Sequence, residues 1–70
     1  MHAMSAKYEK YVGRVMVIIY QDRAGRLTQR RILIRSVSNG RLRAYDLTRR
    51  APRLFDTSRI LAADPAAGSA

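Results

Sequence analysis

The amino-acid sequence predicts a mainly β protein: a small five-stranded barrel, preceded by a short N-terminal helix and ending in a short or missing last strand. Three observations lead to this fold class. The chain has 70 residues, which is room for one small domain. Its apolar runs are short and rich in β-branched residues, as in the segment 14–21. Turn residues separate these runs, and Asn39-Gly40 is a strong signal for a two-residue hairpin.

The N-terminal segment 1–11 predicts a short helix. The hydroxyl of Ser5 can cap such a helix by accepting a hydrogen bond from its first turn. Tyr8 and Tyr11 fall on one helical face, so we expect both rings to pack the helix against the barrel. Gly13 ends the helix.

Three strands are expected to follow in an antiparallel meander. Segment 14–21 is apolar on both strand faces, which is typical of a central strand. Residues 22–25 form a turn, and the second strand runs over about 26–37. The third strand, 41–47, alternates between apolar and polar residues. The predicted core residues are Ile18, Ile32, Ile34, Leu42 and Phe55.

The C-terminal part predicts weaker elements. Residues 48–52 read as a basic loop, in which Pro52 argues against a strand. A short fourth strand covers 53–55, and a turn leads to 59–61, which is either a single helical turn or a short last strand. Residues 63–70 hold no core-forming side chain and are expected to be a disordered tail.

Four or five short strands after one short helix are typical of an SH3-like or Sm-like barrel, here over residues 12–62. Ile60 and Leu61 are followed at once by Ala-Ala-Asp-Pro, which leaves little chain to close such a barrel. An unpaired strand edge of this kind can be completed by a second copy of the chain.

The net positive charge of the chain indicates which classes of molecule it binds. The chain carries 14 Lys and Arg against 5 Asp and Glu, a formal net charge of +9. A charge of this sign predicts attraction to polyanions such as nucleic acid, nucleotides or acidic lipid. Twelve of the basic residues are Arg, whose planar guanidinium suits bidentate contacts with phosphate or a guanine edge. A GC-rich genome is the other explanation for the Arg preference.

Composition argues against several other classes. The chain has no Cys and one His, so disulfides, thiolate metal sites and cysteine nucleophiles are excluded. The longest apolar run, 15–20, is far shorter than the ~18 residues of a membrane span. The start lacks the apolar stretch of a signal peptide, so a cytoplasmic protein is expected. The carboxylates lie in turns or at strand ends, and we expect no enzymatic activity, no cofactor and no metal.

Several segments share the spacing of a known pattern. The first is residues 20–25, where an aromatic strand end is followed by a turn with an acidic residue and Gly. The second is Arg30 or Arg31 before Ile32, and the third is the strand 40–46 with its Ala-Tyr pair. The last two are Arg53-x-Phe55 and Arg59-Ile60. In this respect the chain resembles the WYL-domain family over about residues 13–61. The tripeptide Trp-Tyr-Leu, from which the family takes its name, corresponds to residues 40–42, where only the Leu is kept.

The resemblance implies an Sm-like β-barrel of bacterial origin. WYL domains serve as ligand-sensing modules beside helix-turn-helix regulators, nucleases and helicases, with ligands that include single-stranded DNA and oligonucleotides. Their basic and aromatic positions form the binding surface. The corresponding candidate site residues here are Tyr20, Arg31 (or Arg30), Arg43, Tyr45, Arg53 and Arg59.

Each candidate also has a structural interpretation. Tyr20 can stack on a base or simply pack at the barrel rim. Arg41, Arg43 and Tyr45 share a strand face that is either a nucleic-acid surface or a solvated outer face. Arg53 points to the same side of its strand as Phe55, and a charge on the core side needs a partner. The partner is Asp46, Asp56, a backbone carbonyl or an incoming phosphate. The same alternatives apply to Arg59.

These observations favour a non-enzymatic binding module. The expected ligand is an anion such as single-stranded nucleic acid or an oligonucleotide, in a transcription-regulatory or nucleic-acid-processing context, and no membrane is involved. The alternative is a structural or interaction module that forms a homodimer or larger homo-oligomer, or docks to a partner, through the open barrel edge. A third hypothesis is an SH3-like binder of structured RNA on the ribosome or a polymerase.

Overall fold

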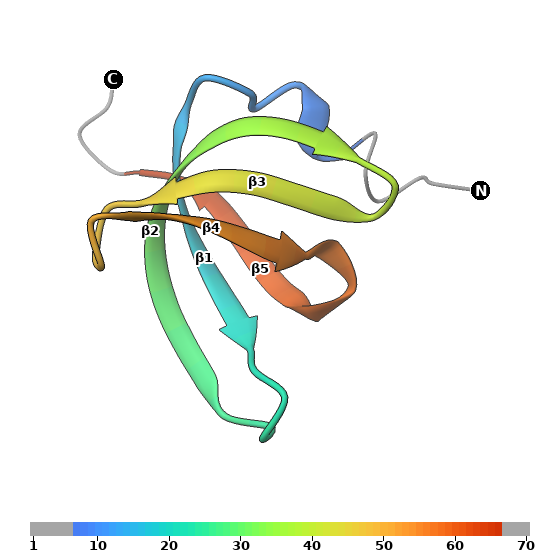
Figure 1. The fold of residues 1–70 in the computed structure, drawn as a ribbon, viewed down its shortest axis with the longest axis vertical. Coiled ribbons are helices and arrows are strands. Elements are labelled where there is room, and N and C mark those ends of the chain that lie inside the picture. The colour runs from blue at the N-terminus through green and yellow to red at the C-terminus, as the bar shows by residue number, and fades with distance from the viewer. Residues whose placement is uncertain (1–6, 67–70) are drawn as a thin grey trace.

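The computed structural model describes residues 7–66 and contains five β-strands (Figure 1). The strands are β1 (Val15–Gln21), β2 (Leu27–Ser38), β3 (Arg41–Asp46), β4 (Ala51–Asp56) and β5 (Ile60–Pro65). The 3₁₀ helix η1 (Thr57–Arg59) connects β4 to β5, and residues 7–9 form a helical turn before β1. The prediction of a mainly β chain with a short N-terminal helix is confirmed, although the proposed cap at Ser5 lies outside the described residues.

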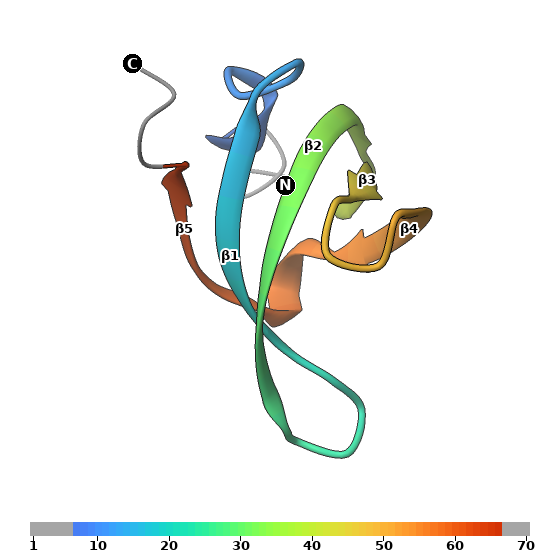
Figure 2. The ribbon, with the colours of Figure 1, turned by 90° about the vertical axis from the view of Figure 1, so that its left-hand side faces the viewer.

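The strands form one antiparallel sheet in the order β4-β3-β2-β1-β5. The register between β2 and β3 shifts between Ile34 and Ser36, and such a bulge increases local twist and bending. Figure 2 shows β1 and β5 on one side of the curved sheet and β3 and β4 on the other. Within residues 7–66, β4 and β5 form no strand pair, so the sheet is curled but is not closed into a barrel.

The inner face of the curved sheet forms the core. Alternate residues of each strand point inward, so apolar side chains at every second position bury one another. All five predicted core residues are buried. Tyr8 is also buried and belongs to this cluster, while Tyr11 is partly buried against it. Burial raises the pKa of the Tyr8 hydroxyl.

Two turns fix the strand register. In the β1–β2 turn the Gly25 N–H donates to the Asp22 carbonyl at 2.9 Å, and Gly25 has φ +85°. In the β2–β3 turn Asn39 and Gly40 have φ of 52° and 74°. Positive φ at both central residues is what a tight hairpin between right-twisted strands needs, so the Asn-Gly hairpin prediction is confirmed.

The prediction of a loop over 48–52 is wrong at its C-terminal end. β4 begins at Ala51 and includes Pro52, which pairs with Tyr45 of β3. Proline lacks a backbone N–H, but β4 is the outermost strand, where alternate N–H groups point away from the sheet. The edge position therefore tolerates a residue that a central strand would exclude.

The last strand is longer than predicted. β5 extends to Pro65 and pairs with β1, with Ala63 opposite Ile18 and Asp64 opposite Val17. Ala66 is buried, and its N–H donates to the Val15 carbonyl at 3.0 Å. Backbone pairing with β1 orders this segment even though its side chains are small. The expected disordered tail therefore does not begin at residue 63, and its remainder, 67–70, lies outside the described residues.

No helix within residues 7–66 is long and apolar enough to cross a membrane.

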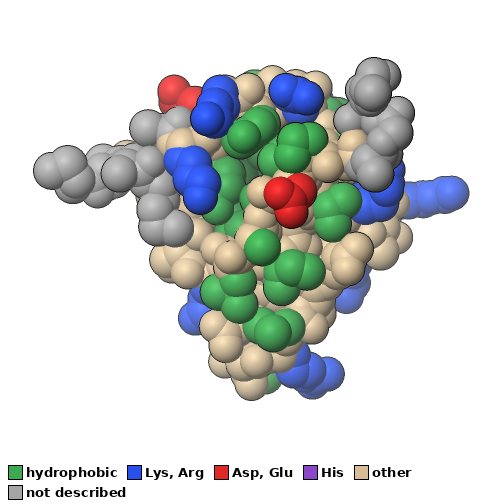
Figure 3. Space-filling model, turned by 180° about the vertical axis from the view of Figure 1, so that it is seen from behind, with side chains coloured by type: hydrophobic (Ala, Val, Ile, Leu, Met, Phe, Trp, Pro, Cys, Tyr) green, Lys and Arg blue, Asp and Glu red, His purple; other side chains and the backbone are tan. Residues whose placement is uncertain are grey.

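Seen from behind, the centre of one face holds hydrophobic side chains around one acidic side chain, with Lys and Arg at the rim (Figure 3). The positive charge is thus gathered away from the middle of this face.

Candidate functional site

Two hollows in the surface meet at the edge strand β4, and together they contain five of the six predicted site residues. The Tyr20 hollow has a volume of about 910 Å³ and lies among the β1–β2 turn, β4 and η1. Its aromatic and basic side chains are Tyr20, Phe55, Arg23, Arg41, Arg53 and Arg59.

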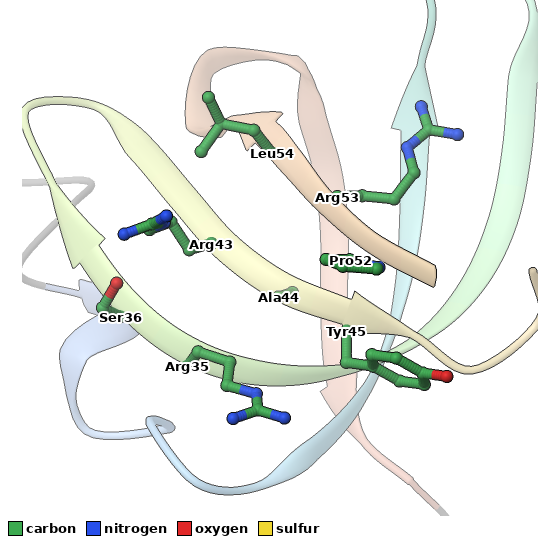
Figure 4. A pocket seen from close by; sticks show the side chains of 8 residues that line it. All are labelled: Arg35, Ser36, Arg43, Ala44, Tyr45, Pro52, Arg53 and Leu54. Carbon is green, nitrogen blue, oxygen red and sulfur yellow. The ribbon is translucent and has the colours of Figure 1, made fainter. Parts of the chain in front are cut away.

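The Tyr45 hollow has a volume of about 670 Å³ and lies over β2, β3 and β4 (Figure 4). Its main side chains are Arg35, Arg43, Tyr45, Pro52, Arg53 and Leu54. The two hollows lie on opposite sides of β4, and Arg53 and Leu54 line both of them.

Two aromatic rings give the Tyr20 hollow a rigid apolar wall. The rings of Tyr20 and Phe55 meet edge to face, with centroids 5.0 Å apart and planes at 76°. The Tyr20 hydroxyl accepts a hydrogen bond from the Asp56 N–H at 3.2 Å, which ties the end of β1 to the end of β4. Phe55 is fully buried, whereas Tyr20 is half-buried and lines the hollow. The Tyr20 ring thus packs on Phe55, and Tyr20 also lines the hollow.

Two arginines are held in place beside these rings. The Arg53 guanidinium lies 5.6 Å from the centroid of the Phe55 ring, within the range of a cation–π contact. The Arg59 Nη1 donates to the Asp22 carbonyl at 3.1 Å. A guanidinium has five N–H donors, so each of these contacts leaves donors for a ligand. Within residues 7–66, neither arginine forms an ion pair with a carboxylate.

Two carboxylates also line the Tyr20 hollow. Asp22 Oδ1 accepts a hydrogen bond from the Arg26 N–H at 2.8 Å. Asp56 Oδ1 accepts from the Ser58 hydroxyl at 2.7 Å and from the Ser58 N–H at 3.0 Å. These bonds to Ser58 lower the pKa of Asp56, and the charges of Arg59 and Arg41 lower it further. Both carboxylates therefore cap local turns, and four arginines outnumber them in the hollow.

The Tyr45 hollow carries basic and aromatic groups on the other side of β4. Tyr45 is half-buried and lies opposite Leu33 on β2 and Pro52 on β4. Arg35 and Arg43 are exposed. In Figure 4 the Arg53 guanidinium points away from these side chains, toward the far side of β4.

Arg31 does not join the other predicted site residues. It is exposed, pairs with Val17 in the middle of the sheet and lines neither hollow. Its neighbour Arg30 points to the inner face and pairs with Asp46, with Nη1 and Oδ2 2.9 Å apart. Arg30 is thus structural, and Asp46 is excluded as the partner that the sequence suggested for Arg53.

Sequence reasoning missed other residues of the hollows. Arg41 was expected to share a face with Arg43 and Tyr45, but it lines the Tyr20 hollow instead. Arg41 is the first residue of β3 and pairs with Asp56, which also lines the Tyr20 hollow, so its place at the strand end decides which hollow it joins. Arg23 and Arg35 also line the hollows, and their position in a turn and beside a bulge gave no separate signal.

No group of three or more His, Cys, Asp or Glu within residues 7–66 could hold a metal ion. The arginines and tyrosines of the two hollows are suited instead to anionic, aromatic ligands. Comparison with family models, curated proteins and solved structures finds no match to this chain.

Proposed function

We propose that this chain is a non-enzymatic module that binds single-stranded nucleic acid or an oligonucleotide. The observation that carries the proposal is the convergence of Tyr20, Arg53 and Arg59 on one hollow from β1, β4 and η1. The sequence also resembles the WYL-domain family, although the curled sheet is not closed into the barrel that this resemblance implies. That resemblance supports a transcription-regulatory or nucleic-acid-processing context.

The chemistry of the Tyr20 hollow matches the two parts of a nucleotide. An aromatic ring offers a base a stacking surface, which contributes about 1–3 kcal/mol per base. Guanidinium groups offer a phosphate paired N–H donors in a fixed fork. Arg53 and Arg59 are already oriented by Phe55 and by the Asp22 carbonyl, so less side-chain freedom is lost on binding. The net charge of +9 adds long-range attraction.

The open sheet supports a second candidate function. β4 and β5 are the two outermost strands, and each has six residues. Edge strands offer unpaired backbone groups to a strand from another chain. A structural module that forms homo-oligomers through these edges is therefore the alternative, and its charge would then be incidental.

The proposal is tested by measuring the affinity for a fluorescein-labelled oligothymidylate by anisotropy at low salt. We expect the double variant Arg41→Ala/Arg53→Ala to bind at least about tenfold more weakly than the wild type, because charge-assisted hydrogen bonds contribute about 1.5–3 kcal/mol each. Neither side chain forms an ion pair within residues 7–66.

The matched control is Arg26→Ala/Arg49→Ala, which removes the same charge from exposed positions outside both hollows. Equal losses in the two variants would show that only the general field binds, and would refute the site. No binding by the wild type at low salt would refute the proposed function. A dimer in light scattering whose mass does not respond to the oligonucleotide would favour the structural alternative.

A further inference from the structure

The two hollows are separated by a single strand that forms the edge of the sheet. β4 pairs with β3 on one side, and no strand within residues 7–66 pairs with its other side. Successive residues of a strand point to opposite sides. Arg53 accordingly lies over the Phe55 ring on one side, while Pro52 and Leu54 open onto the Tyr45 hollow on the other. A ligand that crosses the free edge of β4 therefore reaches both hollows.

Each hollow offers the same pair of chemical groups. The Tyr20 hollow has a half-buried tyrosine with Arg41 and Arg53, and the Tyr45 hollow has a half-buried tyrosine with Arg35 and Arg43. Six of the twelve arginines line the two hollows together: Arg23, Arg35, Arg41, Arg43, Arg53 and Arg59. The ridge between them carries Leu54, which is 51% exposed and offers an apolar surface to a sugar or base.

We propose that one single strand of nucleic acid crosses the edge of β4 and occupies both hollows at once. This inference rests on the proposed function and adds which part of the surface the bound strand covers. Alternating phosphates and bases suit a surface in which arginines and tyrosines recur on both sides of a ridge. A folded peptide or a small anion has no such repeat. Arg35 and Arg43 in the Tyr45 hollow, with no carboxylate among the lining residues, favour a polyanion.

The length of the ligand is the direct consequence. A dinucleotide can fill one hollow only. Reaching both hollows needs about four or more nucleotides, which is the smallest number that an OB-fold binds. Affinity should rise steeply with length until both hollows are filled and then level off. A strand on this edge also competes with a second copy of the chain that pairs with β4.

The test is a titration of oligothymidylates of two, four, eight and twelve nucleotides at low salt, with the wild type and three double variants. We expect Arg35→Ala/Arg43→Ala to lose most of the gain in affinity from two to eight nucleotides, because only the Tyr20 hollow then binds the strand. Arg41→Ala/Arg53→Ala should weaken binding at every length. The matched control Arg26→Ala/Arg49→Ala should keep the gain.

The possible results separate the two proposals. If Arg35→Ala/Arg43→Ala binds the eight-nucleotide strand as tightly as the control does, the strand stays in one hollow and the crossing is refuted, while the proposed function stands. If no strand of any length binds the wild type, the proposed function itself fails. If light scattering shows a dimer that persists with the twelve-nucleotide strand bound, and β4 variants dissociate it, the edge belongs to a second copy and the crossing is refuted.

Discussion

Asp46 is the buried charge on which the β3–β4 connection depends. Its side chain is fully buried, and Oδ2 pairs with the Arg30 guanidinium at 2.9 Å. Oδ1 accepts hydrogen bonds from the N–H groups of Thr48 and Arg49 at 3.0 and 3.1 Å. A buried carboxylate is tolerated only when its oxygens are paired in this way. The turn that it caps leads directly into β4, the strand between the two hollows.

We expect Asp46→Ala to lower the free energy of unfolding by about 3–5 kcal/mol, because it leaves the Arg30 charge without a partner in a largely buried position. Urea unfolding followed by circular dichroism measures the change. The control is Asp64→Ala, which removes an exposed carboxylate from β5 and should change stability by no more than about 0.5 kcal/mol. A loss below about 1 kcal/mol for Asp46→Ala would contradict the structural role of this pair.

Single residues also show the limits of sequence reasoning. The alternation in β2 did not decide between Arg30 and Arg31, because charged and apolar residues occupy both faces of that segment. The structure places Arg30 on the inner face beside Asp46 and Arg31 on the outer face. The partner of Arg30 lies 16 residues away, on β3. Such a pairing becomes visible only once the strand register is known.

Among the elements, η1 positions one wall of the Tyr20 hollow. Asp56 is its N-cap, accepting from the Ser58 N–H, and Arg59 in its last turn reaches the Asp22 carbonyl. The Gly40 carbonyl accepts from both the Thr57 N–H and the Thr57 hydroxyl. This short element therefore ties the end of β4 to the β2–β3 turn and directs the Arg59 side chain into the hollow.

We expect Asp56→Ala to destabilise the protein by about 1 kcal/mol at pH 7, because the cap of η1 is lost. The folded-state pKa of Asp56 is lowered, so the stability that its ionised form contributes is complete above the unfolded value near about 3.9. That stability is lost as the pH falls through the lower folded-state pKa. Urea unfolding of both proteins between pH 7 and 2.5 measures the difference.

The difference in stability between the wild type and Asp56→Ala should shrink toward the acid end of this range. The variant Asp56→Ser keeps a capping oxygen without the charge, and should be nearly as stable as the wild type at pH 7. A difference between wild type and Asp56→Ala that is the same at pH 7 and pH 2.5 would argue against an ionised cap.

The strands differ in how well the sequence predicted them. β1, β2 and β3 have strong patterns and clear turns, and their predicted limits agree with the structure within one residue. β4 and β5 have a proline or small side chains, and their local preferences argue against strands. β5 exists because β1 offers it a backbone partner, which is a long-range effect that no local pattern contains. The sequence therefore predicted the strands with their own apolar faces and missed the extent of the paired edges.

At the scale of the whole molecule, folding converts a spread of arginines into two basic hollows. The arginines come from turns, strand faces and η1, and they are distant in sequence. The net charge and the resemblance both pointed to an anionic ligand, and five of the six selected residues lie in the hollows. The division of these arginines between the two sides of β4, and the place of Arg41 beside Asp56, depend on the register of β3 with β4 and could not be predicted from the sequence.

The central claim is that these arginines bind the phosphates of a single strand, and its most direct test is the salt dependence of binding. The measurement is the affinity of the wild type for an eight-nucleotide oligothymidylate at several salt concentrations. For single strands, log K falls against log salt with a slope of about −0.7 per phosphate contact. Three to five contacts predict a slope of about −2 to −3.5. A slope near zero, or no binding at the lowest salt, would contradict the account.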